Sequence, residues 1–126
     1  MPTPRPDLNG RRIKVRGTTH IYLVDRGLKR HIPNPGTYNN LFKDWDDILE
    51  LDASEFNNIT TGASVTNAAL LARGRGRNDI YLIESFGKRR VVSPAVMDAF
   101  GLDWGKVREV PALALDYALT GPSITT

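Results

Sequence analysis

The sequence predicts an α+β protein that contains two copies of one ββαβ-like unit, arranged about a pseudo-twofold axis with a shared core. The first observation is an internal repeat: residues 21–66 align with residues 80–125 without a gap, at a constant shift of 59, and 14 of the 46 aligned positions are identical. Ordinary residue usage gives roughly one identity in seventeen by chance, so the pattern indicates a tandem duplication. The second observation is size. A unit of about 60 residues buries so little apolar surface that it would be only marginally stable alone, so each copy is expected to complete the interior of the other.

The repeat also predicts how the chain is divided. Residues 1–10 carry alternating prolines, as extended linkers do, and we interpret them as a Pro-rich linker or tail. Residues 11–66 form the first unit and residues 67–126 the second. The two units together are expected to make one compact domain.

Strands are expected where aliphatic and aromatic residues form short runs bounded by turn residues. In the first unit these runs are Ile13–Arg16, Ile21–Val24, Leu28–Ile32 and Asp47–Leu51. Their counterparts in the second unit are Leu70–Ala72, Ile80–Ile83, Lys88–Val92 and Lys106–Val110.

A helix is expected after the hairpin of each unit. Asn34-Pro35 and Ser93-Pro94 each place a capping side chain directly before a proline, the residue favoured at the first helical position. We therefore predict helices at Pro35–Leu41 and Pro94–Phe100, the second of them ending at Gly101. A second short helix is expected at about Ser54–Ile59 and at Ala112–Leu119.

Composition excludes several classes of protein. Hydrophobic residues make up 40% of the 126 and charged residues 25%, as in globular domains, and there is no cysteine. Disulfide scaffolds, thiolate metal sites and cysteine nucleophiles are therefore excluded. We expect no transmembrane segment, because no apolar run is long enough to span a bilayer, and the first residues lack the apolar stretch of a signal peptide.

An Asp-Trp pair recurs in both copies and is the first candidate for a binding role. Trp45 and Trp104 could stack on the face of a sugar ring while Asp44 and Asp103 accept hydrogen bonds from its hydroxyl groups. Tryptophan is usually largely buried, so the alternative is that both indoles are core anchors and the carboxylates cap local turns.

Tyrosine and basic residues recur as well. Tyr22 and Tyr81 lie second in their strands, beside Lys29-Arg30 and Lys88-Arg89 of the return strands. They are either ligand platforms or rings packed across the strand on the Lys or Arg stems. The basic pairs, with the neighbouring Lys14, Arg16, Arg73, Arg75 and Arg77, would form a cationic face for polyanions, or else an ordinary solvated hairpin.

No catalytic pattern is present. His20 and His31 lack metal-ligand spacing, and there is no nucleophile elbow, phosphate-binding loop or dinucleotide fingerprint. The carboxylates of Asp46-Asp47 are replaced by Gly105-Lys106 in the second copy, which argues against an acid–base pair there. We expect a protein that is not an enzyme and that uses neither a cofactor nor a metal.

A known repeat resembles this pattern. The residues that carry the resemblance are Tyr22-Leu23-Val24-Asp25, Lys29-Arg30-His31-Ile32-Pro33, Asp44-Trp45 and Thr61-Gly62. They look like a tandem repeat of bacterial and phage surface or secreted proteins that often accompanies peptidoglycan-acting domains. The second copy departs from it, with Arg90-Val91-Val92-Ser93 in place of His31-Ile32-Pro33-Asn34. The resemblance implies a chain that is extracellular or attached to a cell surface, but no binding residues.

Together these observations favour a non-catalytic binding module for a cell-surface glycan or cell-wall polymer. The residues expected to bind are Tyr22, Lys29, Arg30, Asp44 and Trp45 with Tyr81, Lys88, Arg89, Asp103 and Trp104. The alternatives are a polyanion or nucleic-acid binder that uses the basic face, and a structural or protein-interaction module of a larger surface or virion protein. The sequence leaves the oligomeric state open.

Overall fold

The computed structural model describes residues 1–126 and shows an α+β protein with two four-stranded mixed sheets. The first unit contains β1 (Arg12–Val15), β2 (Tyr22–Asp25), β3 (Leu28–His31), α1 (Pro35–Leu41), β4 (Ile48–Leu51) and α2 (Ala53–Asn57). The second contains β5 (Leu70–Gly74), β6 (Ile80–Glu84), β7 (Gly87–Val91), α3 (Pro94–Ala99), β8 (Arg108–Val110) and α4 (Ala112–Asp116). Two single 3-10 turns, η1 (Pro6–Leu8) and η2 (Trp104–Lys106), complete the elements.

The two sheets have the same topology. Their strand orders are β3-β2-β1-β4 and β7-β6-β5-β8, each with two antiparallel pairs and one parallel pair at the edge strand β4 or β8. Each helix and strand of the second unit begins within one residue of the position that a shift of 59 gives. Two sheets of one topology at one constant shift are consistent with a duplication.

Both proline-started helices form as predicted, because the cap side chains satisfy free backbone amides of the first turn. The Asn34 side chain accepts a hydrogen bond from the Thr37 amide at 2.8 Å, and that of Ser93 accepts one from the Val96 amide at 3.3 Å. Helix α1 has the predicted bounds. Helix α3 ends one residue earlier than predicted, and the chain then turns at Gly101, where φ is +64°.

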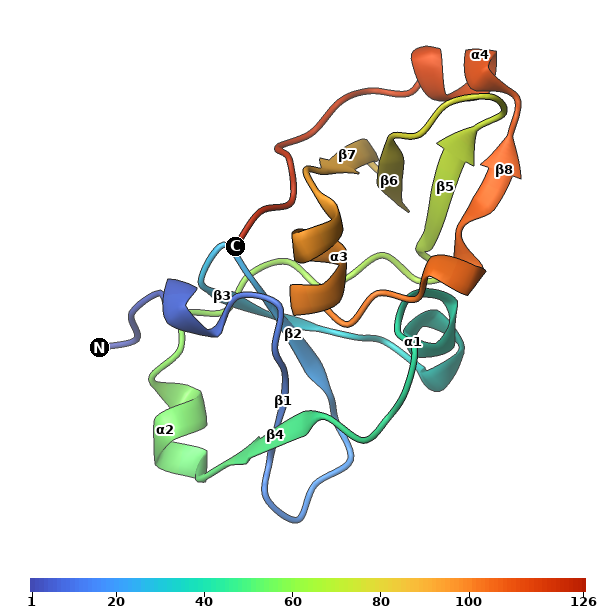
Figure 1. The fold of residues 1–126 in the computed structure, drawn as a ribbon. Coiled ribbons are helices and arrows are strands. Elements are labelled where there is room, and N and C mark those ends of the chain that lie inside the picture. Colours follow the sequence, from blue (N-terminus) through green and yellow to red (C-terminus); the bar gives the residue numbers. More distant parts are fainter.

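One hydrophobic core joins the two units. Its 16 buried residues include Leu23, Tyr38 and Phe42 from the first unit and Leu82 and Phe100 from the second. Helices α1 and α3 lie between the two sheets, whereas α2 and α4 lie at opposite ends of the molecule (Figure 1). The units thus complete each other's interior, as the size argument predicts.

Backbone hydrogen bonds cross the boundary between the two units. The Lys43 amide donates to the Gly101 carbonyl at 3.1 Å, and the Asp103 amide donates to the Leu41 carbonyl at 2.9 Å. These bonds flank an antiparallel bridge between Phe42 and Leu102. The two units are therefore joined by main-chain hydrogen bonds as well as by the shared core.

A smaller core lies on the outer face of the first sheet. It consists of Ile13, Val24, Leu51, Phe56 and Ile59. The N-terminal segment, expected as a linker at residues 1–10, is attached to this side of the unit, because Thr3 forms a parallel bridge with Ile59. None of the helices has the length and hydrophobicity needed to cross a membrane.

Candidate functional site

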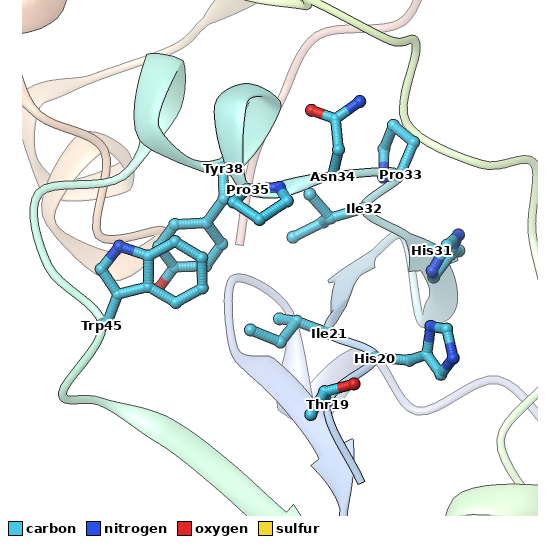
Figure 2. Close-up of a pocket in the computed structure, with 10 residues that line it drawn as sticks. All are labelled: Thr19, His20, Ile21, His31, Ile32, Pro33, Asn34, Pro35, Tyr38 and Trp45. Atoms are coloured by element: carbon cyan, nitrogen blue, oxygen red, sulfur yellow. The ribbon is translucent and has the colours of Figure 1, made fainter.

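A surface pocket of about 230 Å³ opens beside the β2–β3 hairpin of the first unit. Its ten lining residues are Thr19, His20, Ile21, His31, Ile32, Pro33, Asn34, Pro35, Tyr38 and Trp45. Figure 2 shows Trp45 at one end, His20 and His31 at the other, and the side chains of Ile21 and Ile32 between them. We call this the first pocket. It combines an apolar floor with polar side chains at one end, as small-molecule sites do.

Trp45 is a fixed but accessible platform. Its ring stacks on Tyr38 with 3.9 Å between ring centroids and 25° between the planes, and its Nε1 donates to Asn39 Oδ1 at 2.9 Å. Tyr38 is itself buried, and its hydroxyl donates to the Asp44 carbonyl at 2.6 Å. The indole nevertheless stays 44% exposed. The alternative of a core tryptophan is therefore wrong for Trp45.

A second pocket of about 220 Å³ occupies the equivalent place in the second unit. Its lining residues are Asn78, Asp79, Ile80, Arg90, Val91, Val92, Ser93, Pro94, Met97 and Trp104. Each of the ten lies 59 positions after a residue of the first pocket. Trp104 is 50% exposed, so neither tryptophan is a core residue. The two units thus carry one pocket each, formed by equivalent residues.

The two pockets differ at the polar end. His20 and His31 lie with their ring centroids 5.5 Å apart in the first pocket. In the second pocket the same positions carry Asp79 and Arg90, which form an ion pair at 3.5 Å. Neither histidine makes a hydrogen bond through its side chain, so both imidazoles can donate to or accept from a ligand.

The two lysines predicted to bind a ligand lie in the interior. The ammonium of Lys29 is 3.9 Å from the centre of the Phe56 ring and donates to the Phe56 carbonyl at 2.7 Å. The equivalent Lys88 lies over Tyr81 and donates to the Leu115 carbonyl. Burial lowers the pKa of the Lys29 ammonium. Both lysines therefore tie the hairpin to the outer helix of its own unit and do not face solvent.

Arg30 and Arg89 are buried as well, in a cluster of four charges that joins the two units. Each arginine contacts the acid of its own hairpin and the acid of the other: Arg30 lies 2.9 Å from Asp25 and 2.5 Å from Glu84, and Arg89 lies 2.5 Å from Asp25 and 3.8 Å from Glu84. We call Asp25, Arg30, Glu84 and Arg89 the buried quartet. Its two acids and two arginines balance in charge.

Contacts within the quartet shift the pKa values of Asp25 and Arg30. Burial alone raises the pKa of Asp25, but the hydrogen bonds and charges of Arg89 and Arg30 outweigh it, so the pKa lies below its usual range. Burial lowers the pKa of Arg30, and Glu84 and Asp25 reverse that effect, leaving it raised. Both groups are therefore held in their charged forms.

The remaining predicted site residues have structural contacts close to the pockets. Tyr22 is half-buried and packs on Phe56 and His31, with ring centroids 4.9 and 5.1 Å apart. The carboxylates of Asp44 and Asp103 accept from the amides of Asp46 and Gly105, at 3.2 and 2.8 Å. Each Asp thus caps the local turn beside its tryptophan, as the alternative for these residues proposed.

The expected cationic face is largely neutralised. Four of its residues form ion pairs, the half-buried Lys14 with Glu50 and the exposed Arg16 with Asp52, Arg73 with Glu109 and Arg77 with Asp116. Of the lysines and arginines assigned to that face, Arg75 alone is exposed and makes no ion pair. Little unpaired charge is left there for a polyanion.

Sequence reasoning found the tryptophans but missed the pocket around them. Ile21 and Ile80 are identical in the repeat, and the residue before each, His20 or Asp79, faces the return strand at His31 or Arg90. The sequence could have indicated the pocket, because a hairpin brings His20 close to His31 and Asp79 close to Arg90. No group of three or more His, Asp or Glu side chains is arranged to hold a metal ion.

Comparison with protein-family models and with curated proteins gives no match to this chain.

Proposed function

We propose that the protein is a non-catalytic binding module that takes one sugar unit of a cell-surface glycan or cell-wall polymer in each of its two tryptophan pockets. The observation that carries the proposal is the position-by-position equivalence of the two pockets. Each unit keeps an exposed indole at the same place although the residues around it differ. Trp45 and Trp104 are 44% and 50% exposed, and each of them lines a pocket.

The chemistry of the pockets favours a sugar. Drug-sized ligands occupy pockets of about 300–1,000 Å³, so sites of about 230 and 220 Å³ suit one small ring. An indole held on Tyr38 and Asn39 offers a flat apolar face at little cost in side-chain entropy. The polar ends, with His20 and His31 or Asp79 and Arg90, supply donors and acceptors for hydroxyl groups.

Two sites on one rigid core favour a repeating ligand. When one pocket is occupied, the second meets the same polymer at a high effective concentration, so weak sites combine into useful avidity. The proposal includes the tandem duplication itself, with the units related by a pseudo-twofold axis. The shared topology, the shared core and the reciprocal contacts of the quartet support this. A chain of this kind would work at a cell surface.

The test uses purified cell walls and a glycan array with four proteins: the unaltered chain, Trp45→Ala, Trp104→Ala and the double variant. Each single variant should keep one weak site and lose avidity, with retention falling at least about tenfold. The double variant should not bind. Tyr117→Ala is the matched control, because Tyr117 is an exposed aromatic residue outside both pockets. Equal retention of a folded double variant would defeat the proposal.

The same experiment separates the two other candidates. A polyanion binder would be retained on heparin with a steep dependence on salt and without need of either tryptophan. A protein-interaction module would show no binding to any glycan. Either result would replace the proposed function.

A further inference from the structure

The outer side of each unit contains a short edge formed by the residues that follow the second helix. In the first unit this edge is Ile59–Thr61, and in the second it is Ala118–Thr120. Both edges are joined to their hairpins by the same contact, a parallel bridge from Thr61 to Lys29 or from Thr120 to Lys88. Each edge is therefore continuous with the sheet of its unit on one side.

The first edge is also covered on its other side. Thr3 pairs with Ile59 in a parallel bridge: the Thr3 amide donates to the Asn58 carbonyl at 2.8 Å, and the Thr60 amide donates to the Thr3 carbonyl at 3.0 Å. Pro2 and Pro4 flank Thr3 and keep this segment extended. The N-terminal segment thus acts as an added strand.

The second edge has no such strand. The Tyr117 carbonyl and the Leu119 amide are the counterparts of the two groups that bind Thr3, and neither makes a hydrogen bond in the chain. The residue equivalent to Thr3 is Gly62, which does not cover this edge, because its amide is bonded to the Lys29 carbonyl. An open pair of this kind is a template for another strand.

The side chains beside the open edge are apolar and exposed. Leu113, Tyr117 and Leu119 are 66%, 86% and 74% exposed. Phe86 in the β6–β7 turn adds a fourth, at 44%. The first unit carries Ser54, Asn58 and Thr60 at the places of the first three. The covered edge is thus polar, and the uncovered edge is apolar.

We propose that this edge of the second unit, from Tyr117 to Leu119, binds an extended, proline-flanked apolar segment of another polypeptide by strand addition. The bound residue would donate its amide to the Tyr117 carbonyl and accept from the Leu119 amide, as Thr3 does in the first unit. Its apolar side chain would pack on the exposed side chains around the edge. A second copy of this chain is the less favourable occupant, because its own N-terminal segment would first have to leave Ile59.

The test titrates the full ¹⁵N-labelled chain with a nine-residue peptide that has the sequence of residues 1–9 but carries Thr3→Val. Hydrogen exchange at the Leu119 amide should slow at least about tenfold at saturation, because the amide gains a bonded partner. The Thr60 amide, which is already bonded, should not change. An unchanged Leu119 amide at about 1 mM peptide overturns the proposal, since even a weak site is partly filled there.

Two controls identify the contacts. The same peptide with an N-methyl group on residue 3 lacks the donor for the Tyr117 carbonyl and should bind roughly three- to tenfold more weakly. The variant Tyr117→Asn/Leu119→Thr places the first unit's residues at exposed positions, so it should stay folded and bind the apolar peptide more weakly. Equal affinity in both controls argues against strand addition. Protection of Leu119 without peptide, rising with protein concentration, would show that a second copy is the occupant and would overturn the choice of partner.

Discussion

Replacing Arg89 with methionine should strongly destabilise the protein. The Arg89 side chain is fully buried and donates to Asp25 Oδ2 at 2.5 Å, to Asp25 Oδ1 at 3.1 Å and to the Pro122 carbonyl at 2.7 Å. Methionine keeps most of the aliphatic stem but none of these donors. Of the two buried arginines that contact Asp25, only Arg30 would remain, and it also binds Glu84.

The magnitude follows from the charge balance of the quartet. Without Arg89 the cluster changes from two acids and two arginines to two acids and one arginine, so one buried negative charge is unpaired. Removing one partner of a buried ion pair costs about 3–5 kcal/mol. Arg30→Met should cost a similar amount, because Arg30 binds Glu84 as Arg89 binds Asp25. A loss of that size is a large part of the total stability of an ordinary domain.

Urea unfolding followed by circular dichroism measures the loss. Arg73→Met is the matched control, since Arg73 pairs with Glu109 at 3.4 Å on the surface, where such a pair contributes about 1 kcal/mol or less. If the free energies of unfolding of Arg89→Met and Arg73→Met differ by less than about 1 kcal/mol, the quartet does not hold the units together and the reasoning fails.

Three further predictions concern Asp25 of the quartet, the two exposed tryptophans and the close contact at Gly87. The pKa of Asp25 is lower in the folded than in the unfolded chain, so its charge stabilises the fold above about pH 4. The midpoint of urea unfolding should therefore fall as the pH drops from about 4 to 2. The variant Asp25→Asn, although less stable at neutral pH, should show a smaller decline of this midpoint. Tryptophan fluorescence should be quenched readily by acrylamide, because Trp45 and Trp104 are 44% and 50% exposed; blue-shifted emission that resists the quencher would contradict the pockets. Gly87→Ala should lower the free energy of unfolding, measured with urea, by more than about 2 kcal/mol, because Gly87 has φ +146° and a Cβ there would collide with the Leu119 carbonyl. A loss below about 0.5 kcal/mol would contradict this packing.

The elements of the fold were largely predictable because the repeat reports each of them twice. Asn34-Pro35 and Ser93-Pro94 located the helix starts by local chemistry, which needs no tertiary contact. Helix ends depend more on packing, and α4 ends at Asp116, earlier than the predicted Leu119. The covering of Ile59 by Thr3 could not be predicted, because the pairing is non-local and the proline pattern equally describes a free linker.

The candidate site was predictable only in part. A repeated Trp marks either a core anchor or an exposed platform, and the exposed fractions of Trp45 and Trp104, 44% and 50%, decide between them. Whether Arg30 and Arg89 are buried or exposed depends on which face of the hairpin contacts the other unit, and the periodicity of the sequence alone does not show this. The acids at equivalent positions, Asp25 and Glu84, are the partners that allow this burial, since charged side chains are almost never fully buried unless they are paired.

The indole NH signals of Trp45 and Trp104 provide the most direct measurement of the proposed function. The chain has two tryptophans, so a ¹⁵N spectrum contains two such signals, and each reports on one pocket. When a soluble fragment of the bound glycan is added, both signals should shift over a similar range of concentration. Binding of the glycan with both indole signals unmoved would contradict the assignment of the pockets.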